Sequence, residues 1–572
     1  MTEIKWWQSA VFYQVYPRSF ADSNVDGIGD LRGITARLDY LKSLGIDAIW
    51  LSPHYPSPQF DCGYDIADYM GVEPQYGTLD DFKVLLREAH ARGLRLILDL
   101  VLNHTSDLHP WFLESRSSRD NPRRDWYVWR DGKNGGPPNN WNSPFGLTAW
   151  EWDETTGQYY YHYFFKQQPD LNWRNPQVKQ AMWQAVRFWL DLGVDGFRLD
   201  ALGTIFETPD YPDHTSKISM FDLYRDAEAR TLPPEEVESA FREIFKHQVD
   251  LPEVLDLMKE LRAVVNAYPD RMLVGETEDI RYYGSGDDAL NLVFNFPLTE
   301  TRRLTPAHIR ANQKKRLSAL PPGAWPCNTL GNHDSPRVKS RFGDGKNDDA
   351  LARLHLALML TLRGTPFLYN GEEIGMTDLI LSELGQIRDN VAMFYYKGAT
   401  ELLGMPAEKA LEIAVNNTRD RCRTPMQWNG SPNAGFSPAG VQPWLPVNPN
   451  FQAGINVAAQ ETDPASMLSF YRVLLQLRKD TPALIDGDYT PLHEEAEDFF
   501  TFLRHSPSNG QTCLVVLNLS EKPLSLRFDL RPNRARRLYA SAKKAGEVDD
   551  LGALALAPFE IYIAELINNL RQ

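Results

Sequence analysis

The 572-residue sequence is poor in features that would mark a disulfide-bonded, zinc-binding or nucleic-acid-binding protein. Its four cysteines lie far apart and include no Cys-x-x-Cys pair, which argues against a disulfide framework and a zinc site. Acidic residues outnumber basic ones by 76 to 60, giving a net charge of −16. Such a charge argues against binding to nucleic acid or an anionic membrane, and it favours a neutral or cationic ligand.

Signals for export and for membrane insertion are also missing. The N-terminal stretch MTEIKWWQSAVFY lacks a cationic start followed by an apolar segment, and no apolar run is long enough to span a bilayer. We therefore expect a protein of the reducing cytoplasm that does not bind membranes. The sequence leaves open whether it is a monomer or a homodimer.

Aromatic residues, in contrast, are plentiful. The chain has 15 Trp, 24 Tyr and 27 Phe, and 42% of all residues are hydrophobic. Most of these side chains are expected in a large core, but aromatic faces also suit sugar rings.

Short apolar segments alternate with helical patterns along most of the chain, which predicts an α/β protein. Eight such segments are expected to be strands, at 10–15, 46–51, 94–102, 193–201, 272–277, 290–294, 327–330 and 366–369. Helices are predicted at 31–44, 79–92, 176–192, 350–362 and 464–479. Eightfold alternation with polar residues after the strands predicts a (β/α)8 TIM barrel, whose active site lies at the C-terminal ends of the strands.

Three segments depart from this alternation. Residues 105–174 are rich in Trp, Tyr, Asn and Pro and predict an inserted domain after the third strand. Residues 375–460 form a long excursion after the eighth strand. From 485 to 572 the pattern alternates as in strands, which predicts a C-terminal antiparallel β-sandwich. The catalytic barrel is thus expected to comprise 1–104 and 175–484.

The stretch GVDGFRLDA at 193–201 is unusual for a buried strand. Alternation places Arg198 and Asp200 on one face. A neighbouring guanidinium lowers the pKa of a carboxylate, and an ionised, positioned carboxylate can act as a nucleophile. A structural ion pair at a strand end is the alternative, and this stretch alone does not decide between them.

Further carboxylates follow other predicted strands. Asp99, Glu276 and Asp334 occupy such positions, with Asn103, His104 and His333 close by in sequence. Carboxylates from separate strands that meet at one rim raise one another's pKa, so a purely structural cluster is unfavourable. Glycoside cleavage uses such a set: an ionised nucleophile, and a carboxylic acid that protonates the leaving oxygen.

These motifs make the sequence resemble glycoside hydrolase family 13, the α-amylase family. The resemblance covers essentially the whole chain and rests on DLVLNH (99–104), GFRLDA (196–201), VGET (274–277) and LGNHD (330–334), in the family's order. QPDLNW (168–173) and TPMQW (424–428) narrow it to members similar to α-glucosidases and oligo-1,6-glucosidases.

The resemblance implies a role for each matched residue. It makes Asp200 the nucleophile, Glu276 the general acid/base and Asp334 the stabiliser of the transition state. It further implies a substrate-binding set made up of Asp61, Tyr64, His104, Phe145, Phe164, Arg198, Ala201, His333 and Arg419. Within this set, Asp61 and Arg419 match the pair that closes the pocket and makes such enzymes exo-acting.

The segment from Asp22 to Asp30 has oxygen-bearing side chains at alternate positions, as calcium loops do. It is no complete EF-hand, because its twelfth position is Gly33 rather than Glu, and an Asp/Asn/Gly-rich turn is the alternative. The resemblance implies a structural metal site, with calcium or magnesium bound by Asp22, Asn24, Asp26, Ile28 and Asp30. No organic cofactor is expected.

The implied activity is that of a retaining, exo-acting α-glucosidase on short oligosaccharides, with transfer of glucose as a side reaction. Ala201 favours α-1,4-linked substrates or sucrose, because relatives that cleave α-1,6 linkages tend to carry Val there. Trehalose synthase, oligo-1,6-glucosidase and sucrose isomerase activities are the alternatives. The RLDRD-type loop of sucrose isomerases is absent around 380–400.

Two other readings are less favoured. A non-catalytic, transporter-associated relative would need a membrane span and would usually lack the carboxylates, whereas a pure carbohydrate-binding protein would not need Glu276 beside Asp200. The sequence also departs from the family at Cys62, where relatives often carry Asn, and at Cys422. We predict that both cysteines are packing residues.

Overall fold

The computed structural model describes residues 4–229 and 232–567 of the chain. Eight parallel strands form a nearly closed barrel, in the order β10-β11-β1-β2-β3-β7-β8-β9. Their bounds are β1 Phe12–Val15, β2 Ala48–Leu51, β3 Arg95–Val101, β7 Gly196–Asp200, β8 Met272–Gly275, β9 Leu292–Val293, β10 Cys327–Thr329 and β11 Thr365–Tyr369. All eight correspond to predicted strands, and the predicted barrel is confirmed.

The barrel has a seam between β9 and β10. Among the described residues, no backbone ladder joins these two strands. Amide side chains bridge the seam instead: the Nδ2 group of Asn295 donates to Oδ1 of Asn328 at 3.2 Å and to Oδ1 of Asn312 at 2.9 Å.

Helices surround the barrel strands. The main ones are α5 Leu79–Ala91, α7 Pro176–Leu192, α10 Glu253–Val265, α11 Pro306–Ala319, α13 Asp348–Thr361 and α17 Met467–Asp480. The single helix predicted for 31–44 is wrong, since α3 Leu31–Ala36 and α4 Leu38–Leu44 are separate. Arg37 leaves the helical conformation between them, and its guanidinium lies 4.1 Å from the ring centroid of Trp428.

Helix α7 sets the position of β7. The Asn175 side chain accepts a hydrogen bond from the Gln177 backbone N–H, and Pro176 occupies the first turn, where its missing N–H does no harm. Gly193 ends the helix with a φ of +108°, a left-handed conformation that glycine adopts without strain. The chain then enters β7 directly.

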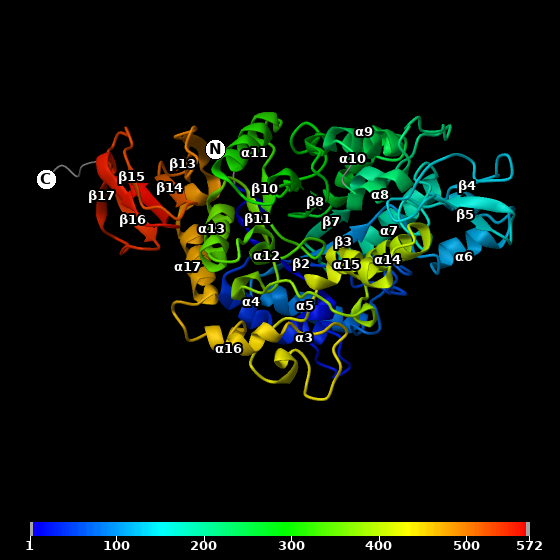
Figure 1. Cartoon of the computed structure of the whole chain (residues 1–572), viewed down its shortest axis with the longest axis horizontal. Helices are drawn as coiled ribbons and strands as arrows, with labels where there is room; N and C mark the ends of the chain where they lie inside the picture. The colour runs from blue at the N-terminus through cyan, green and yellow to red at the C-terminus, as the bar shows by residue number, and fades with distance from the viewer. Residues whose placement is uncertain (1–3, 230–231, 568–572) are drawn as a thin grey trace.

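The segment 105–174 contains α6 Pro110–Ser117 and a three-stranded antiparallel sheet of β4 Trp129–Arg130, β6 Gln158–Tyr161 and β5 Trp150–Asp153. The excursion after β11 contains α14 Asn390–Lys397, a π-helix at Gly398–Leu402 and α15 Ala407–Asn417. Figure 1 shows the cyan β4–β6 region at one end of the molecule and the red C-terminal strands at the other, with the barrel between them.

The C-terminal region is antiparallel, as predicted. Six strands form one sheet, β12 Asp488–Leu492, β13 Phe499–His505, β14 Thr512–Asn518, β19 Ile561–Leu566, β16 Arg534–Ala540 and β17 Val548–Asp550, and β15 Leu524–Leu526 pairs with β18 Leu554–Leu556. Within the described part of the chain, no helix combines the length and the apolar character needed to cross a bilayer.

Candidate active site

A cavity of about 270 Å³ opens at the C-terminal ends of the barrel strands. Its lining comprises ten of the predicted site residues and Val391: Asp61, Tyr64, His104, Phe145, Phe164, Asp200, Ala201, Glu276, Asp334, Val391 and Arg419. The two remaining predicted residues, Arg198 and His333, are buried and contact members of this lining. The structure therefore brings all three predicted catalytic carboxylates to one cavity.

Arg198 links the carboxylates of the cavity. Its Nη1 lies 2.6 Å from Oδ1 of Asp99 and 2.7 Å from Oδ1 of Asp200, and its Nη2 lies 2.6 Å from Oε1 of Glu276. The Trp50 indole N–H and the Tyr64 hydroxyl donate to the other oxygen of Asp99. One guanidinium thus serves three carboxylates.

This sharing changes the expected electrostatics of Asp200. We expected Arg198 to lower the pKa of the neighbouring carboxylate, but burial and the negative charges of Glu276, Asp99 and Asp334 outweigh the guanidinium, and the pKa of Asp200 lies well above its usual range. Burial likewise raises the pKa of Asp99 to about 6 despite its bond to Arg198. The expectation for Asp200 was wrong because it considered the ion pair without the other carboxylates.

Glu276 follows β8 and is held from two sides. Its Oε1 bonds to Arg198, and its Oε2 accepts the backbone N–H of Ala201 at 3.0 Å. Ala201 directs this N–H by adopting a left-handed backbone, with φ 43° and ψ 45°. A non-glycine residue in this conformation is strained by roughly 1–2 kcal/mol, so the turn after Asp200 is held in place by its surroundings.

Asp334 has a different set of partners. Its Oδ1 lies 2.5 Å from Nη2 of Arg423 and 3.4 Å from Nη1 of Arg419. Burial opposes ionisation, but the charges around Asp334 outweigh it and hold the pKa well below its usual range. His333 contacts Asp334 at 3.2 Å, yet burial lowers the pKa of that imidazole so far that it is neutral. The guanidiniums of Arg423, Arg419 and Arg198 are therefore the charges that keep Asp334 ionised.

His333 connects Asp334 to the barrel interior. Its Nε2 lies 2.5 Å from the Tyr64 hydroxyl and its Nδ1 lies 2.7 Å from Nε2 of Gln14. The Tyr64 ring also stacks on the imidazole, with centroids 5.4 Å apart and an interplanar angle of 12°. These contacts fix both rings beneath the cavity.

An ion-pair network lies at the end of the cavity lined by Asp61 and Arg419. Nη2 of Arg419 lies 2.7 Å from Oδ1 of Asp61 and 2.7 Å from Oδ1 of Asp389. The Gln168 amide donates to Oδ2 of Asp61 at 3.1 Å and lies 2.9 Å from Nε2 of His104. Burial lowers the pKa of His104 to about 3, so its imidazole is neutral at physiological pH.

Aromatic rings form one wall. The Phe145 and Phe164 rings stack with centroids 5.9 Å apart, and Phe164 meets the His104 ring edge-on at 5.3 Å. An apolar wall facing charged groups suits a pyranose, which has apolar C–H faces and a polar equator.

Several residues of the site were not predicted. Gln168 lies in QPDLNW, and Arg423 directly precedes TPMQW, so sequence motifs pointed to both. Asp389 and Val391 come from the irregular excursion after β11, where no motif or periodicity marked them. Asp389 caps α14 by accepting the backbone N–H of Val391 and also binds Arg419, so it ties that helix to the end of the cavity lined by Asp61 and Arg419.

The two unusual cysteines are buried. Burial raises the pKa of the Cys62 thiol to about 11 and that of Cys422 to about 12, so neither is a reactive thiolate near neutral pH. Cys62 has a φ of 51°, a conformation that Asn tolerates better than most residues. The backbone thus gives a physical reason for the Asn found there in relatives.

The predicted metal loop precedes α3. Asp22 accepts the backbone N–H groups of Val25 and Gly27, and Asp30 accepts those of Ser23 and Gly33. In the described ranges, no group of three or more His, Cys, Asp or Glu side chains is arranged to hold a metal ion. The Asp22 and Asp30 carboxylates thus accept backbone N–H groups of the loop itself, and calcium stays a prediction that enters no step below.

The barrel, its inserted segment and the carboxylate-lined cavity at the strand ends define a glycoside hydrolase. A family model for the α-amylase catalytic domain matches residues 14–487. The chain therefore belongs to the α-amylase family, as its motifs indicated.

Its relatives are glucosidases. An oligo-1,6-glucosidase of Parageobacillus thermoglucosidasius is 40% identical over 98% of this chain and 99% of its own length. A probable alpha-glucosidase of Rhizobium meliloti is 42% identical over 90% of each chain. Among solved structures, the trehalulose synthase of Pseudomonas mesoacidophila MX-45 has a TM-score of 0.88 and 40% identity over 99% of this chain and 100% of its own.

Proposed function

We propose that this enzyme is a retaining, exo-acting α-glucosidase that removes terminal α-linked glucose from short oligosaccharides and also transfers glucose. The observation that carries the proposal is the convergence of Asp200, Glu276 and Asp334 on a small cavity whose far end is closed by Asp61 and Arg419. A closed end accepts one terminal sugar and stops a longer chain from passing through.

In the first step, a carboxylate oxygen of Asp200 attacks the anomeric carbon while Glu276 gives its proton to the departing glycosidic oxygen. One C–O bond forms to Asp200 and one C–O bond to the leaving group breaks. Asp334, ionised beside Arg423 and Arg419, stabilises the positive charge that develops on the sugar ring. Both reacting carboxylates bond to one guanidinium, which supports the short separation of about 5–5.5 Å that retaining enzymes use.

In the second step, Glu276 takes a proton from water, and the water oxygen displaces Asp200 from the anomeric carbon. Two inversions return the α-anomer. A sugar hydroxyl in place of water gives transglucosylation by the same bond changes, with its proton again going to Glu276.

The cavity also provides the proton that this cycle requires. Three carboxylates share Arg198, and the raised pKa values of Asp200 and Asp99 show that full ionisation is unfavourable. Glu276 is the most accessible of the three, with 22% of its side chain exposed against 10% for Asp200 and none for Asp99. We therefore assign to Glu276 the exchange of the proton with substrate and solvent.

For linkage preference, Ala201 supports α-1,4-linked glucosides and sucrose. Its small side chain lines the cavity next to the nucleophile and leaves room on the leaving-group side. A β-branched residue there would also be strained by the left-handed backbone.

A second candidate is isomerisation of sucrose, in which the released fructose attacks the glucosyl group. The likeness to solved trehalulose and isomaltulose synthases supports it. An isomaltulose synthase of Erwinia rhapontici NX5, solved with sucrose, has a TM-score of 0.86 to this chain. It is 37% identical over 99% of this chain and 100% of its own. We also propose a cytoplasmic location and a structural calcium ion. Both of these proposals rest on the sequence alone.

The test is product analysis with maltose, isomaltose, sucrose and trehalose at equal concentration, for the natural enzyme and for Ala201→Val. We expect maltose or sucrose to be cleaved fastest, with α-glucose as the first product by NMR, and Ala201→Val to raise the isomaltose-to-maltose ratio. Initial release of β-glucose would refute the retaining mechanism. Conversion of sucrose mainly into an isomeric disaccharide would favour the second candidate.

A further inference from the structure

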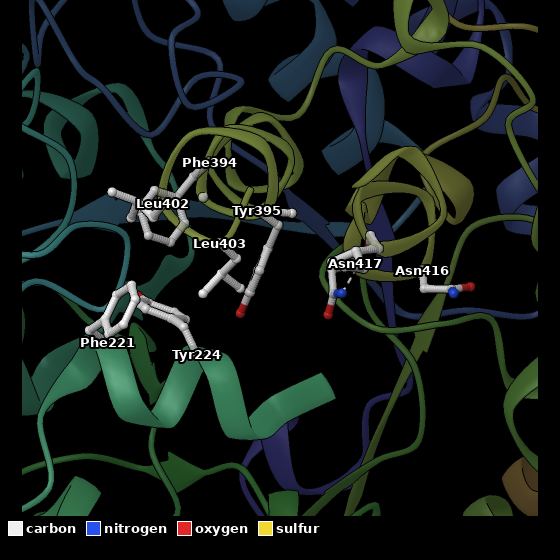
Figure 2. A pocket seen from close by; sticks show the side chains of 11 residues that line it. Phe221, Tyr224, Phe394, Tyr395, Leu402, Leu403, Asn416 and Asn417 are labelled. Carbon is white, nitrogen blue, oxygen red and sulfur yellow. Dashed lines mark hydrogen bonds between the residues drawn. The ribbon is translucent and has the colours of Figure 1, made fainter. Parts of the chain in front are cut away.

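A second cavity, of about 400 Å³, lies between α8 (Met220–Ala229) and the helices of the excursion after β11. Figure 2 shows Phe221 and Tyr224 rising from α8 toward Tyr395 and Leu402 on the opposite side. The Tyr224 ring meets the Phe394 ring edge-on, with centroids 5.3 Å apart. We call this cavity the aromatic pocket.

The chemistry of the aromatic pocket differs from that of the catalytic cavity. Of the eleven described residues that line it, none is charged, and the amide side chains are those of Asn416 and Asn417. Asn417 already donates to the backbone carbonyl of Ile413 in its own helix. The catalytic cavity, in contrast, is lined by four carboxylates, His104 and Arg419. With no charged group, and with the Tyr224 hydroxyl and the Asn417 amide already bonded within the protein, the lining offers few partners to sugar hydroxyls, each of which needs one when it leaves water.

Helix α14 joins the two cavities. Val391 lines the catalytic cavity, while Phe394, Tyr395 and Gly398 line the aromatic pocket. Residues three, four and seven positions apart lie on one face of a helix, and one turn advances by about 5.4 Å. The two cavities therefore follow one another along a single helix face, about one turn apart.

A second contact links the two cavities from the other side. The Tyr224 hydroxyl donates to the backbone carbonyl of Pro144 at 2.7 Å, and the next residue, Phe145, belongs to the catalytic cavity. A residue of α8 that lines the aromatic pocket thus bonds to the neighbour of a residue that lines the catalytic cavity.

We propose that the aromatic pocket binds the apolar aglycone of alkyl or aryl α-glucosides whose glucosyl group occupies the catalytic cavity. This inference deepens the proposed function and rests on it, since the catalytic cavity must hold the glucose. The uncharged lining and the shared face of α14 favour an apolar group attached to glucose over a second sugar.

Two substitutions block the pocket. Gly398→Trp fills it, and a Cβ added at Gly398 meets no heavy atom within 4 Å. Gly385→Trp is the matched control, because that glycine is equally open, lies in the same excursion and does not line the pocket. Leu402→Glu, with Leu402 46% exposed, is the second variant, and Ile380→Glu, with Ile380 66% exposed and outside the pocket, is its control.

The measurement is calorimetric binding of n-alkyl α-glucosides, from methyl to dodecyl, to Asp200→Asn protein, which cannot cleave them by the proposed mechanism. We expect Kd to change little for the shortest chains and then to fall by up to about fourfold for each methylene that enters the pocket. Gly398→Trp and Leu402→Glu should abolish this fall without changing the Kd of the methyl glucoside. Both control variants should keep the fall.

A Kd that does not depend on chain length would overturn the inference. A decrease in Kd with chain length that is as large in Gly398→Trp or Leu402→Glu as without them would overturn it too. If Gly398→Trp fails to fold, Leu402→Glu and its control decide. Failure of the proposed function is seen separately, as absence of maltose cleavage by the natural enzyme, while the chain-length series still reports on the pocket.

Discussion

Asp195 directly precedes β7 and Asp200 ends it. Both carboxylates are buried, yet their surroundings shift the pKa in opposite directions. Asp195 lies 2.7 Å from His90 and 2.7 Å from Arg95, and accepts the Leu96 backbone N–H at 2.9 Å. These partners outweigh burial and lower its pKa. At Asp200 one guanidinium is divided among three carboxylates, and the pKa is raised.

The comparison separates a structural ion pair from a reactive one. Asp195 has several donors to itself, whereas Asp200 competes with Asp99 and Glu276 for the single guanidinium of Arg198. Such competition is unfavourable for stability and keeps a proton within the site, which is what acid/base chemistry needs. Arg198 and Asp200, which strand alternation places on one face of GFRLDA, could have formed a structural or a reactive ion pair. The neighbouring carboxylates decide which of the two it is.

The sharpest test replaces each aspartate by Asn. Asp200→Asn should lower kcat on maltose by at least about a thousandfold, because no nucleophile remains. Asp195→Asn should instead lower the free energy of unfolding by about 3 kcal/mol, because it disrupts a buried, paired charge. Turnover assays and calorimetric Tm values measure the two effects. A loss of turnover in folded Asp195→Asn as large as that in Asp200→Asn would contradict the comparison.

Arg423 is the positioning residue for Asp334, and its removal should have the next largest effect. Its Nε donates to the His333 carbonyl while its Nη2 bonds to Asp334. Arg423→Gln should lower kcat about a hundredfold. Turnover assays with maltose measure this loss.

Arg423→Lys should restore part of kcat, since it keeps the charge but loses the fork geometry. Arg421→Lys is the matched control in the same loop, because its Nε is 3.6 Å from Asp378 and it is not bonded to Asp334. A kcat of Arg423→Lys no higher than that of Arg423→Gln would contradict this positioning role.

Asp99→Asn should move the acid limb of kcat/KM to lower pH. Asp99 is one of the negative charges that raise the pKa of Asp200, so its neutral replacement lowers that pKa. Asp200 then stays ionised to lower pH, and kcat/KM should fall off at lower pH than in the natural enzyme. A pH profile of maltose hydrolysis measures this, and a limb that stays in place or rises would argue against a shared proton.

The smallest effect is expected at the two buried cysteines near the site. Cys62→Ser and Cys422→Ser, made separately, should each change turnover by no more than about twofold, because a thiol here acts as a small hydrophobic group. Assays with maltose measure this. A large loss of activity in either variant would mean that the sulfur has a role beyond packing.

Much of the fold and the rim could be predicted from the sequence, because strand ends in a barrel bring distant residues together and each motif marks one strand end. Asp389 and Val391 could not, since they lie at the start of α14, an eight-residue helix too short for its period to stand out in the excursion after β11. The direction of the Asp200 pKa also escaped prediction, because it depends on charges from several strands rather than on the adjacent Arg198.

The seam between β9 and β10 separates the strand that leads to Glu276 from the strand that leads to Asp334. Side-chain amides at Asn295, Asn312 and Asn328 bridge it where the other strands have backbone ladders. The barrel can therefore widen there without breaking any main-chain pairing. A displacement of Asp334 relative to Glu276 across this seam would therefore disrupt side-chain hydrogen bonds rather than a main-chain ladder.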